Sequence, residues 1–159
     1  MPWENENALG YFEQAERLAP RDGTYPNHTA DFLLTALQDP DRALQKADKA
    51  ILKIAQRVDQ HYALPDALGV KAVALLDLGR AEDALAMFST FRAAASSGPM
   101  MPHLDLRFVS RLLRDDVFVD DCIEYLEDCE RFADTVKNEE MRNTATALLS
   151  KAREKGDDT

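Results

Sequence analysis

The stretch Leu78-Gly79-Arg80-Ala81-Glu82-Asp83-Ala84-Leu85-Ala86-Met87-Phe88 decides how this chain folds. An apolar helical run ends at Leu78, and a second amphipathic run begins directly after Gly79. Glycine is suited to this turn, because a left-handed backbone ends a helix without steric cost only when Cβ is absent. The acidic side chains of Glu82 and Asp83 then complement the positive end of the next helix dipole. The stretch therefore predicts two helices joined by a tight turn.

The same helical periodicity continues along the whole sequence. Apolar residues recur three or four positions apart, and no stretch shows the strict alternation of a strand. Capping residues and prolines mark the helix ends: Asp39 is expected to cap a helix that opens with Pro40, and Asn138 is expected to cap the last helix. The predicted fold class is all-α, with helices at about 5–18, 27–38, 40–60, 66–78, 81–95, 102–114, 117–136 and 138–155.

Composition limits the classes of function. The 159 residues fit one domain, and 19 basic against 29 acidic residues give a net charge of −10. This excess of negative charge opposes binding to nucleic-acid phosphates and to anionic membrane surfaces. Residues 1–7 lack the features of a signal peptide, and no apolar run approaches the roughly 20 residues that span a bilayer. We therefore expect no nucleic acid and no membrane as partners.

The two cysteines, Cys122 and Cys129, fall in one predicted helix. Seven residues of helix separate them by roughly 10 Å of rise, which is too far for a disulfide. Small core positions are the expected role of both side chains. A chain without disulfides favours a reduced, cytoplasmic setting.

A short pattern repeats along the chain. Asn7-Ala8-Leu9, Arg42-Ala43-Leu44, Asp83-Ala84-Leu85 and Asp121-Cys122-Ile123 each open an amphipathic helix, at intervals of 35 to 41 residues. Together with the helix–turn–helix from Leu68 to Phe88, this array resembles the tetratricopeptide repeat (TPR) family, whose unit is about 34 residues long. Lys71, Ala47 and Phe91 depart from the family pattern.

The resemblance implies a TPR-like stack of antiparallel helical hairpins, wound as a right-handed α-superhelix. Residues 1–159 would form a single helical repeat domain. Residues 5–20 would be a lone second-type helix, followed by hairpins at 26–60, 65–95 and 102–136 and by a C-terminal capping helix at 138–155. The inner helices of such a stack line a concave groove that binds peptides.

A basic face stands out against the acidic background. Arg107, Arg111 and Arg114 are spaced four and three residues apart, so they lie on one face of their helix. Aligned with the TPR pattern, all three would face the groove, where guanidinium groups pair with carboxylates. An alternative is a solvated face in which Arg111 pairs with Asp115. The same alignment adds six groove residues: Gly69, Val73, Leu76, Asn27, Asp31 and Leu34.

The leading hypothesis is a non-enzymatic protein–protein interaction adaptor that binds a partner segment, acidic if the arginines take part. A small acidic TPR chaperone of the secretion type is an alternative. A third reading is self-association, because the lone first helix would leave an apolar side near Trp3 and Leu9 uncovered. Either a second copy covers that side in a homodimer, or the chain is cut from a longer repeat array.

Catalytic and metal-binding motifs are missing from the sequence. The histidines His28, His61 and His103 are scattered, without cysteines or carboxylates at ligand spacing. There is no glycine-rich phosphate loop and no nucleophile elbow. We therefore expect no enzymatic activity, no metal and no cofactor.

Overall fold

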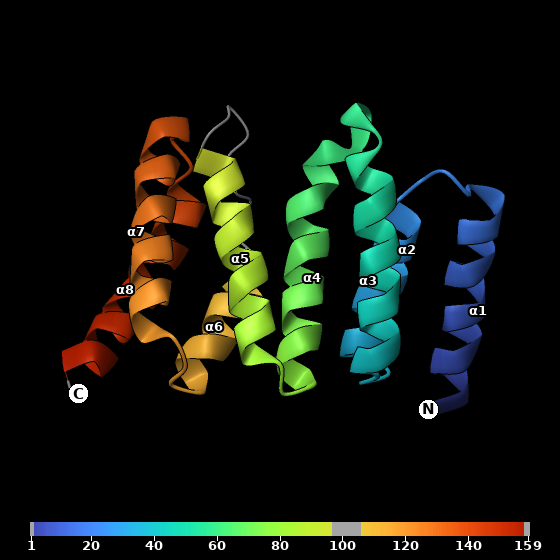
Figure 1. The fold of residues 1–159 in the computed structure, drawn as a ribbon, viewed down its shortest axis with the longest axis horizontal. Coiled ribbons are helices and arrows are strands. Elements are labelled where there is room, and N and C mark those ends of the chain that lie inside the picture. The colour runs from blue at the N-terminus through green and yellow to red at the C-terminus, as the bar shows by residue number, and fades with distance from the viewer. Residues whose placement is uncertain (1, 97–105, 158–159) are drawn as a thin grey trace. The chain divides into compact units, whose positions relative to one another are not determined.

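The computed structural model describes the backbone of residues 2–96 and 106–157, and the side chains of 4–89 and 108–156. Within these ranges every regular element is helical, which confirms the all-α prediction (Figure 1). The chain divides into two compact units with the boundary at Phe91, inside one helix. The elements are α1 Pro2–Leu18, α2 Thr24–Thr35, α3 Pro40–Ala55, the 3₁₀ helix η1 Val58–Ala63, α4 Leu64–Asp77, α5 Ala81–Ser96, α6 Leu106–Arg114, α7 Val119–Val136 and α8 Glu139–Asp157.

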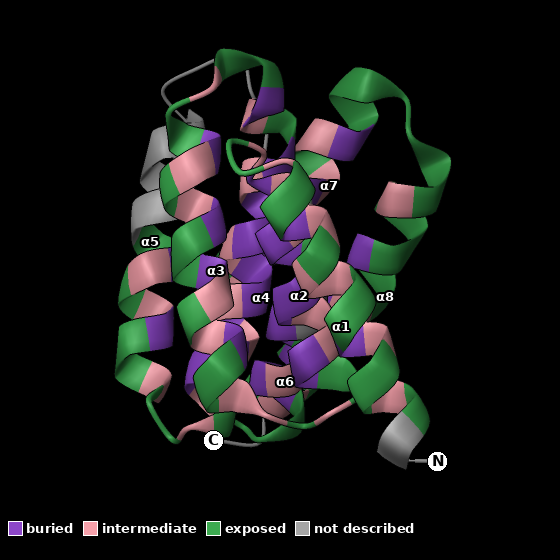
Figure 2. Cartoon of the chain, turned by 90° about the vertical axis from the view of Figure 1, so that its right-hand side faces the viewer, coloured by how far each residue is buried: buried purple, intermediate pink, exposed green. Residues whose placement is uncertain are grey.

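The first unit is built around α2, which packs against α1, α3 and α4. Figure 2 shows buried positions along α2 and α4, and exposed positions on the outer face of α1. The ring centroids of Phe12 on α1 and Phe32 on α2 lie 5.1 Å apart, so the two rings pack between these helices. Alanines on α3 allow the neighbouring helices to approach closely. The buried core consists of Leu9, Ala30, Leu33, Leu34, Ala43, Ala47, Val70 and Ala74.

The second unit is a hairpin of α7 and α8, with α6 in contact with both helices. Tyr125 and Phe108 are its largest fully buried side chains. Cys122 and Cys129 are free thiols that are buried on α7, as the sequence predicted for small core residues. The single domain expected from the chain length stays a prediction, because each unit has its own set of buried residues.

Three predicted helix boundaries are confirmed in detail. The Asp39 side chain accepts a hydrogen bond of 3.0 Å from the backbone N–H of Arg42, and Pro40 follows in the first turn of α3. Gly79 has a φ of +74°, so the turn between α4 and α5 is left-handed there. Asn138 Oδ1 accepts from the Met141 N–H at 3.0 Å and caps α8. Local capping chemistry therefore sets these boundaries.

The prediction for α3 was wrong at its C-terminus. The helix ends at Ala55 and not at residue 60, and an extended Arg57 leads into η1. Val58 does not continue the buried stripe, since 85% of it is exposed. The break turns Gln60 inward, where its Oε1 accepts a hydrogen bond of 3.0 Å from the Gly23 N–H.

Other boundaries differ by a few residues. Helix α2 begins at Thr24 and not at Asn27, because Asp22 Oδ1 accepts from the Thr24 N–H at 2.8 Å and from its hydroxyl at 2.6 Å. It ends at Thr35, before Gln38 adopts a left-handed φ of 52°. The predicted start of the sixth helix at Pro102 lies outside the described residues.

Candidate functional site

The arginine face predicted from the sequence lies on α6. Arg111 Nε donates to Asp115 Oδ2 at 3.0 Å, and Arg114 Nε donates to Asp115 Oδ1 at 3.2 Å. The two guanidinium groups lower the pKa of the Asp115 carboxyl through these hydrogen bonds, Arg111 most strongly. The side chain of Arg107 lies outside the described residues. The pairing of Arg111 with Asp115, which the solvated-face alternative predicted, is therefore present.

The six other predicted groove residues differ in how far they are buried. Asn27, Leu34 and Gly69 are buried, which contradicts the prediction that they face an open groove. Leu34 belongs to the core, and Asn27 Nδ2 donates to Asp66 Oδ2 at 2.6 Å. Asp31, Val73 and Leu76 are half-buried. All six belong to the first unit and the arginines to the second, so a groove shared between them stays a prediction.

The predicted self-association surface is also corrected. Leu9 is only 3% exposed, because α2 covers this side of α1. The side chain of Trp3 lies outside the described residues. The apolar side chains that α1 does expose are Tyr11 and Leu18, which lie one heptad apart on the face away from α2. Leu9 is therefore part of the core and not a contact for a second copy.

A basic cleft, which the sequence analysis missed, lies between α1 and α3. It has a volume of about 440 Å³. Four cationic and two carboxylate side chains line it, on a chain whose overall charge is −10. We call it the lysine cleft; its lining residues are Glu13, Glu16, Arg17, Pro20, Lys46, Lys49 and Lys53.

The α3 side of the cleft follows from helical periodicity. Lys46, Lys49 and Lys53 are spaced three and four residues apart, so they share one face of the helix. The face toward the core carries Ala43, Ala47, Ala50 and Ile54, all fully buried. Burial of this apolar stripe directs the lysines toward α1.

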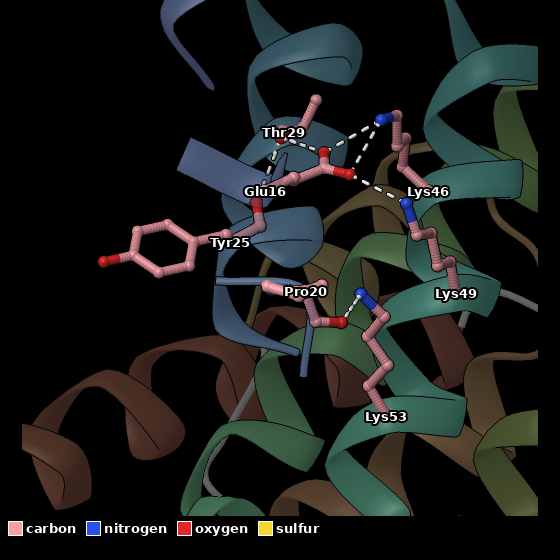
Figure 3. A network of polar contacts seen from close by, with 7 residues as sticks. All are labelled: Glu16, Pro20, Tyr25, Thr29, Lys46, Lys49 and Lys53. Atoms are coloured by element: carbon pink, nitrogen blue, oxygen red, sulfur yellow. Dashed lines mark hydrogen bonds and ion pairs between the residues drawn. The ribbon is translucent and has the colours of Figure 1, made fainter. Parts of the chain in front are cut away.

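At the centre of the cleft, the buried carboxylate of Glu16 is held by hydrogen bonds from two other helices (Figure 3). Lys46 Nζ donates to both Glu16 oxygens, at 2.8 and 3.0 Å, and Lys49 Nζ donates to Oε2 at 3.0 Å. The Thr29 hydroxyl on α2 donates to Oε1 at 2.7 Å.

The charge of Glu16 is stabilised by these partners. Burial acts to raise the pKa of the Glu16 carboxyl, but the hydrogen bonds from Lys46, Thr29 and Lys49 outweigh it. The net direction is a lowered pKa, so Glu16 is an anion at neutral pH.

Part of the positive charge in the cleft remains available to a ligand. Each ammonium group has three hydrogens. Hydrogen bonds to other described residues use two hydrogens of Lys46, one of Lys49 and one of Lys53. Lys53 donates its one to the Pro20 carbonyl at 2.5 Å. The exposed Arg17 has no hydrogen bond or ion pair within the part of the chain that the structure describes. The cleft can therefore bind anionic groups.

A second, smaller pocket of about 210 Å³ lies among α3, α4 and α5. Its charges are matched internally: Lys71 pairs with Asp48 at 2.6 Å, and Arg80 pairs with Asp83 at 2.7 Å. Leu44, Leu75 and Met87 complete the lining. With no excess of either charge, this pocket gives no comparable indication of a ligand.

The lysine row was visible in the sequence as three lysines at helical spacing, but Glu16 was not recognisable as their partner. It lies 30 residues before Lys46, and only the packing of α1 and of α3 against α2 brings the two together. Among the described residues, no group of three His, Cys, Asp or Glu side chains is arranged to hold a metal ion. None of the described helices is both long enough and apolar enough to cross a membrane.

Comparison of the chain with protein-family models, curated proteins and solved structures found no match.

Proposed function

We propose that this chain is a non-enzymatic protein-interaction module, built from TPR-like helical hairpins, that holds an acidic segment of a partner protein. The observation that carries the proposal is the lysine cleft. It gathers four cations against two carboxylates in a chain with an overall charge of −10. A local excess of positive charge attracts an acidic segment and disfavours partners without one.

The chemistry of the cleft favours binding over catalysis. Glu16 is held as an anion, so it has no proton to donate at neutral pH, and its two oxygens already accept four hydrogen bonds, which occupies the lone pairs that a general base would use. The described lining contains no cysteine, serine or histidine that could act as a nucleophile or base. Lysines that keep free hydrogens can instead pair with carboxylates that a ligand brings.

The lysine cleft is a stronger candidate than the arginine face of α6. Arg111 and Arg114 already share the carboxylate of Asp115. Pairing of this kind reduces the charge that a ligand would meet. In the cleft, Lys46 and Lys49 likewise share the carboxylate of Glu16. The difference lies in Lys53, which donates to a neutral carbonyl, and in Arg17, which has no hydrogen bond or ion pair among the described residues.

Binding of a glutamate-rich peptide, measured by isothermal titration calorimetry, tests the proposal. We expect binding that weakens as salt rises, and no binding of the same peptide with glutamine in place of glutamate. The double change Lys49→Gln and Lys53→Gln should weaken binding about tenfold, on the basis of up to about 1 kcal/mol for each partly exposed charge pair.

The matched control neutralises two exposed lysines outside the cleft, by Lys137→Gln and Lys151→Gln. Both double variants lose the same net charge, so a general electrostatic effect would weaken binding equally in each. Circular dichroism checks that both remain helical. Equal affinities of the parent and of the cleft variant would show that the lysine cleft is not the binding site.

A further inference from the structure

We propose that the acidic segment held in the lysine cleft is a helix of a separate protein, with carboxylates at positions i, i+4 and i+7 that lie along α3. This inference rests on the proposed function and names the kind of partner. It follows from the linear arrangement of the cations, from the way the cleft already holds one carboxylate, and from the pitch of the lysine row.

The cations form a row and do not converge on one point. Figure 3 shows the ammonium groups of Lys46, Lys49 and Lys53 one after another along α3. Lys46 and Lys49 meet at Glu16, whereas Lys53 reaches a separate acceptor, the Pro20 carbonyl. A single compact anion such as phosphate would need its donors gathered around one centre. A row of donors fits a row of carboxylates.

Glu16 shows how this row binds a carboxylate. Its group bridges two successive lysines, with Oε2 accepting from both Lys46 and Lys49 at 3.0 Å. The next interval of the row, between Lys49 and Lys53, has no carboxylate of the described chain bridging it. The exposed Arg17 lines the same cleft on α1. A partner carboxylate placed there would repeat the contact that Glu16 makes.

The pitch of the row matches a helix better than an extended chain. A rise of 1.5 Å per residue separates Lys46 from Lys49 by about 4.5 Å and Lys49 from Lys53 by about 6 Å along the axis. Acidic residues of an antiparallel helix at i, i+4 and i+7 have the same intervals in reverse order. An extended chain places successive residues of one face about 6.6 Å apart, so it loses register within the row.

A second copy of this chain is the competing occupant. Helix α7 carries Asp120, Glu124 and Glu127 at the required spacing. However, Glu127 already pairs with Arg153 at 3.0 Å, and each copy has a net charge of −10, so two copies repel each other. Charge complementarity therefore favours a separate acidic protein.

Two synthetic helical peptides of about 20 residues, rich in alanine and glutamine, test whether the cleft prefers carboxylates in one row to carboxylates spread around a helix. The row peptide carries three glutamates at i, i+4 and i+7, and the spread peptide carries the same glutamates at i, i+2 and i+5, around the helix. Fluorescence anisotropy at low salt gives both dissociation constants. We expect the row peptide to bind at least about fivefold more tightly, the equivalent of one well-placed charge pair.

The variant Arg17→Gln tests the cleft without disturbing the Glu16 network, because Arg17 makes no described contact to it. It should weaken binding of the row peptide about twofold to fivefold, whereas Lys151→Gln should leave it unchanged. Equal affinities for both peptides would overturn the helical register and leave the proposed function standing. Binding of neither peptide, nor of the flexible glutamate-rich peptide, would overturn both.

Sedimentation velocity on the parent chain tests the competing occupant. A monomer up to high protein concentration supports a separate partner. A dimer that the double change Lys49→Gln and Lys53→Gln converts to monomer would identify the occupant as a second copy and overturn the proposal.

Discussion

Gly23 and Ile54 approach each other so closely that a single methyl group does not fit between them. A Cβ atom on Gly23 would stand 2.6 Å from Ile54 Cγ1, 2.9 Å from the Ile54 backbone nitrogen and 3.0 Å from the Ala50 carbonyl oxygen. Two of these three atoms belong to the backbone of α3 and cannot rotate away. The φ of Gly23 is −81°, so the close approach, and not the backbone conformation, requires glycine here.

Gly23→Ala should therefore lower the free energy of unfolding by about 1–3 kcal/mol, the usual cost of overpacking. Urea denaturation followed by circular dichroism measures the change. Gly10→Ala is the matched control, since Gly10 lies inside α1 and a Cβ atom added there would meet no atom within 4 Å. That control should raise stability by about 0.5–1 kcal/mol, because alanine favours helix. Equal stability of Gly23→Ala and the parent would refute the close packing of α2 against α3.

Lys137 ends α7 in a left-handed conformation, with φ 56° and ψ 41°. A side chain with Cβ is strained there, whereas glycine is not. Lys137→Gly should raise the free energy of unfolding by about 0.5–1 kcal/mol, and thermal melting provides the measurement. Lys137→Ala removes the same charge and keeps Cβ, so it should give no gain. If both variants gain equally, the loss of charge explains the effect and the backbone does not.

The thiol of Cys122 should be inert in the folded protein. Burial raises its pKa to about 12, and the neighbouring Asp121 acts in the same direction. Since the thiolate is the reactive form, iodoacetamide at pH 8 should modify Cys122 only after denaturant is added. Peptide mass spectrometry would identify the modified residue. Rapid labelling of Cys122 in a sample that is still fully helical would contradict its burial on α7.

The predictions from sequence succeeded where local chemistry decides the structure. Asp39, Gly79 and Asn138 set helix boundaries through contacts within a few residues, and each boundary was placed correctly. Helical periodicity likewise identified all the described α-helices. Caps and helical periodicity depend on residues within about one turn of each other, so they can be predicted directly from the sequence.

The errors have long-range causes. Helix α3 stops early, and Gln60 then bonds to Gly23, 37 residues away. Leu9 was expected on an uncovered face, but the packing of α1 against α2 buries it. Asn27 was placed in a groove, yet it turns toward Asp66, 39 residues along the chain. These hydrogen-bond and packing partners cannot be predicted from a single sequence, because many other residues of the same type could make the same contact.

The candidate site likewise combines a local feature, which the sequence predicts, with long-range contacts, which it does not. The row of Lys46, Lys49 and Lys53 has the same helical spacing of three and four residues as the row of arginines on α6. Only the structure reveals that α1 forms the opposite wall and that Glu16 lies buried between them. Sequence alone can therefore predict a charged helix face but not the cleft that makes it a binding site.

Glu16 also makes the stability of the first unit dependent on pH. The pKa of its carboxyl is lowered in the folded state from an ordinary value of 4.5, so the unfolded chain binds the proton more tightly. The stabilisation from Glu16 is therefore fully present above pH 4.5 and is lost as the pH falls through the folded-state pKa. At neutral pH, Glu16→Gln should lower the free energy of unfolding by about 1–3 kcal/mol, since Lys46 and Lys49 lose an ionic acceptor.

The difference between parent and variant isolates this residue from the other carboxyls that titrate in the same range. Urea denaturation between pH 7 and pH 3.5 should show the difference shrinking toward acid, because protonated Glu16 and glutamine are then both neutral. Glu13→Gln is the control: Glu13 lines the same cleft without a hydrogen bond or ion pair among the described residues, so it should change stability by less than about 0.5 kcal/mol. A difference for Glu16→Gln that stays constant over the whole pH range would mean that its charge does not stabilise the fold, and that the lysines are held in place by packing alone.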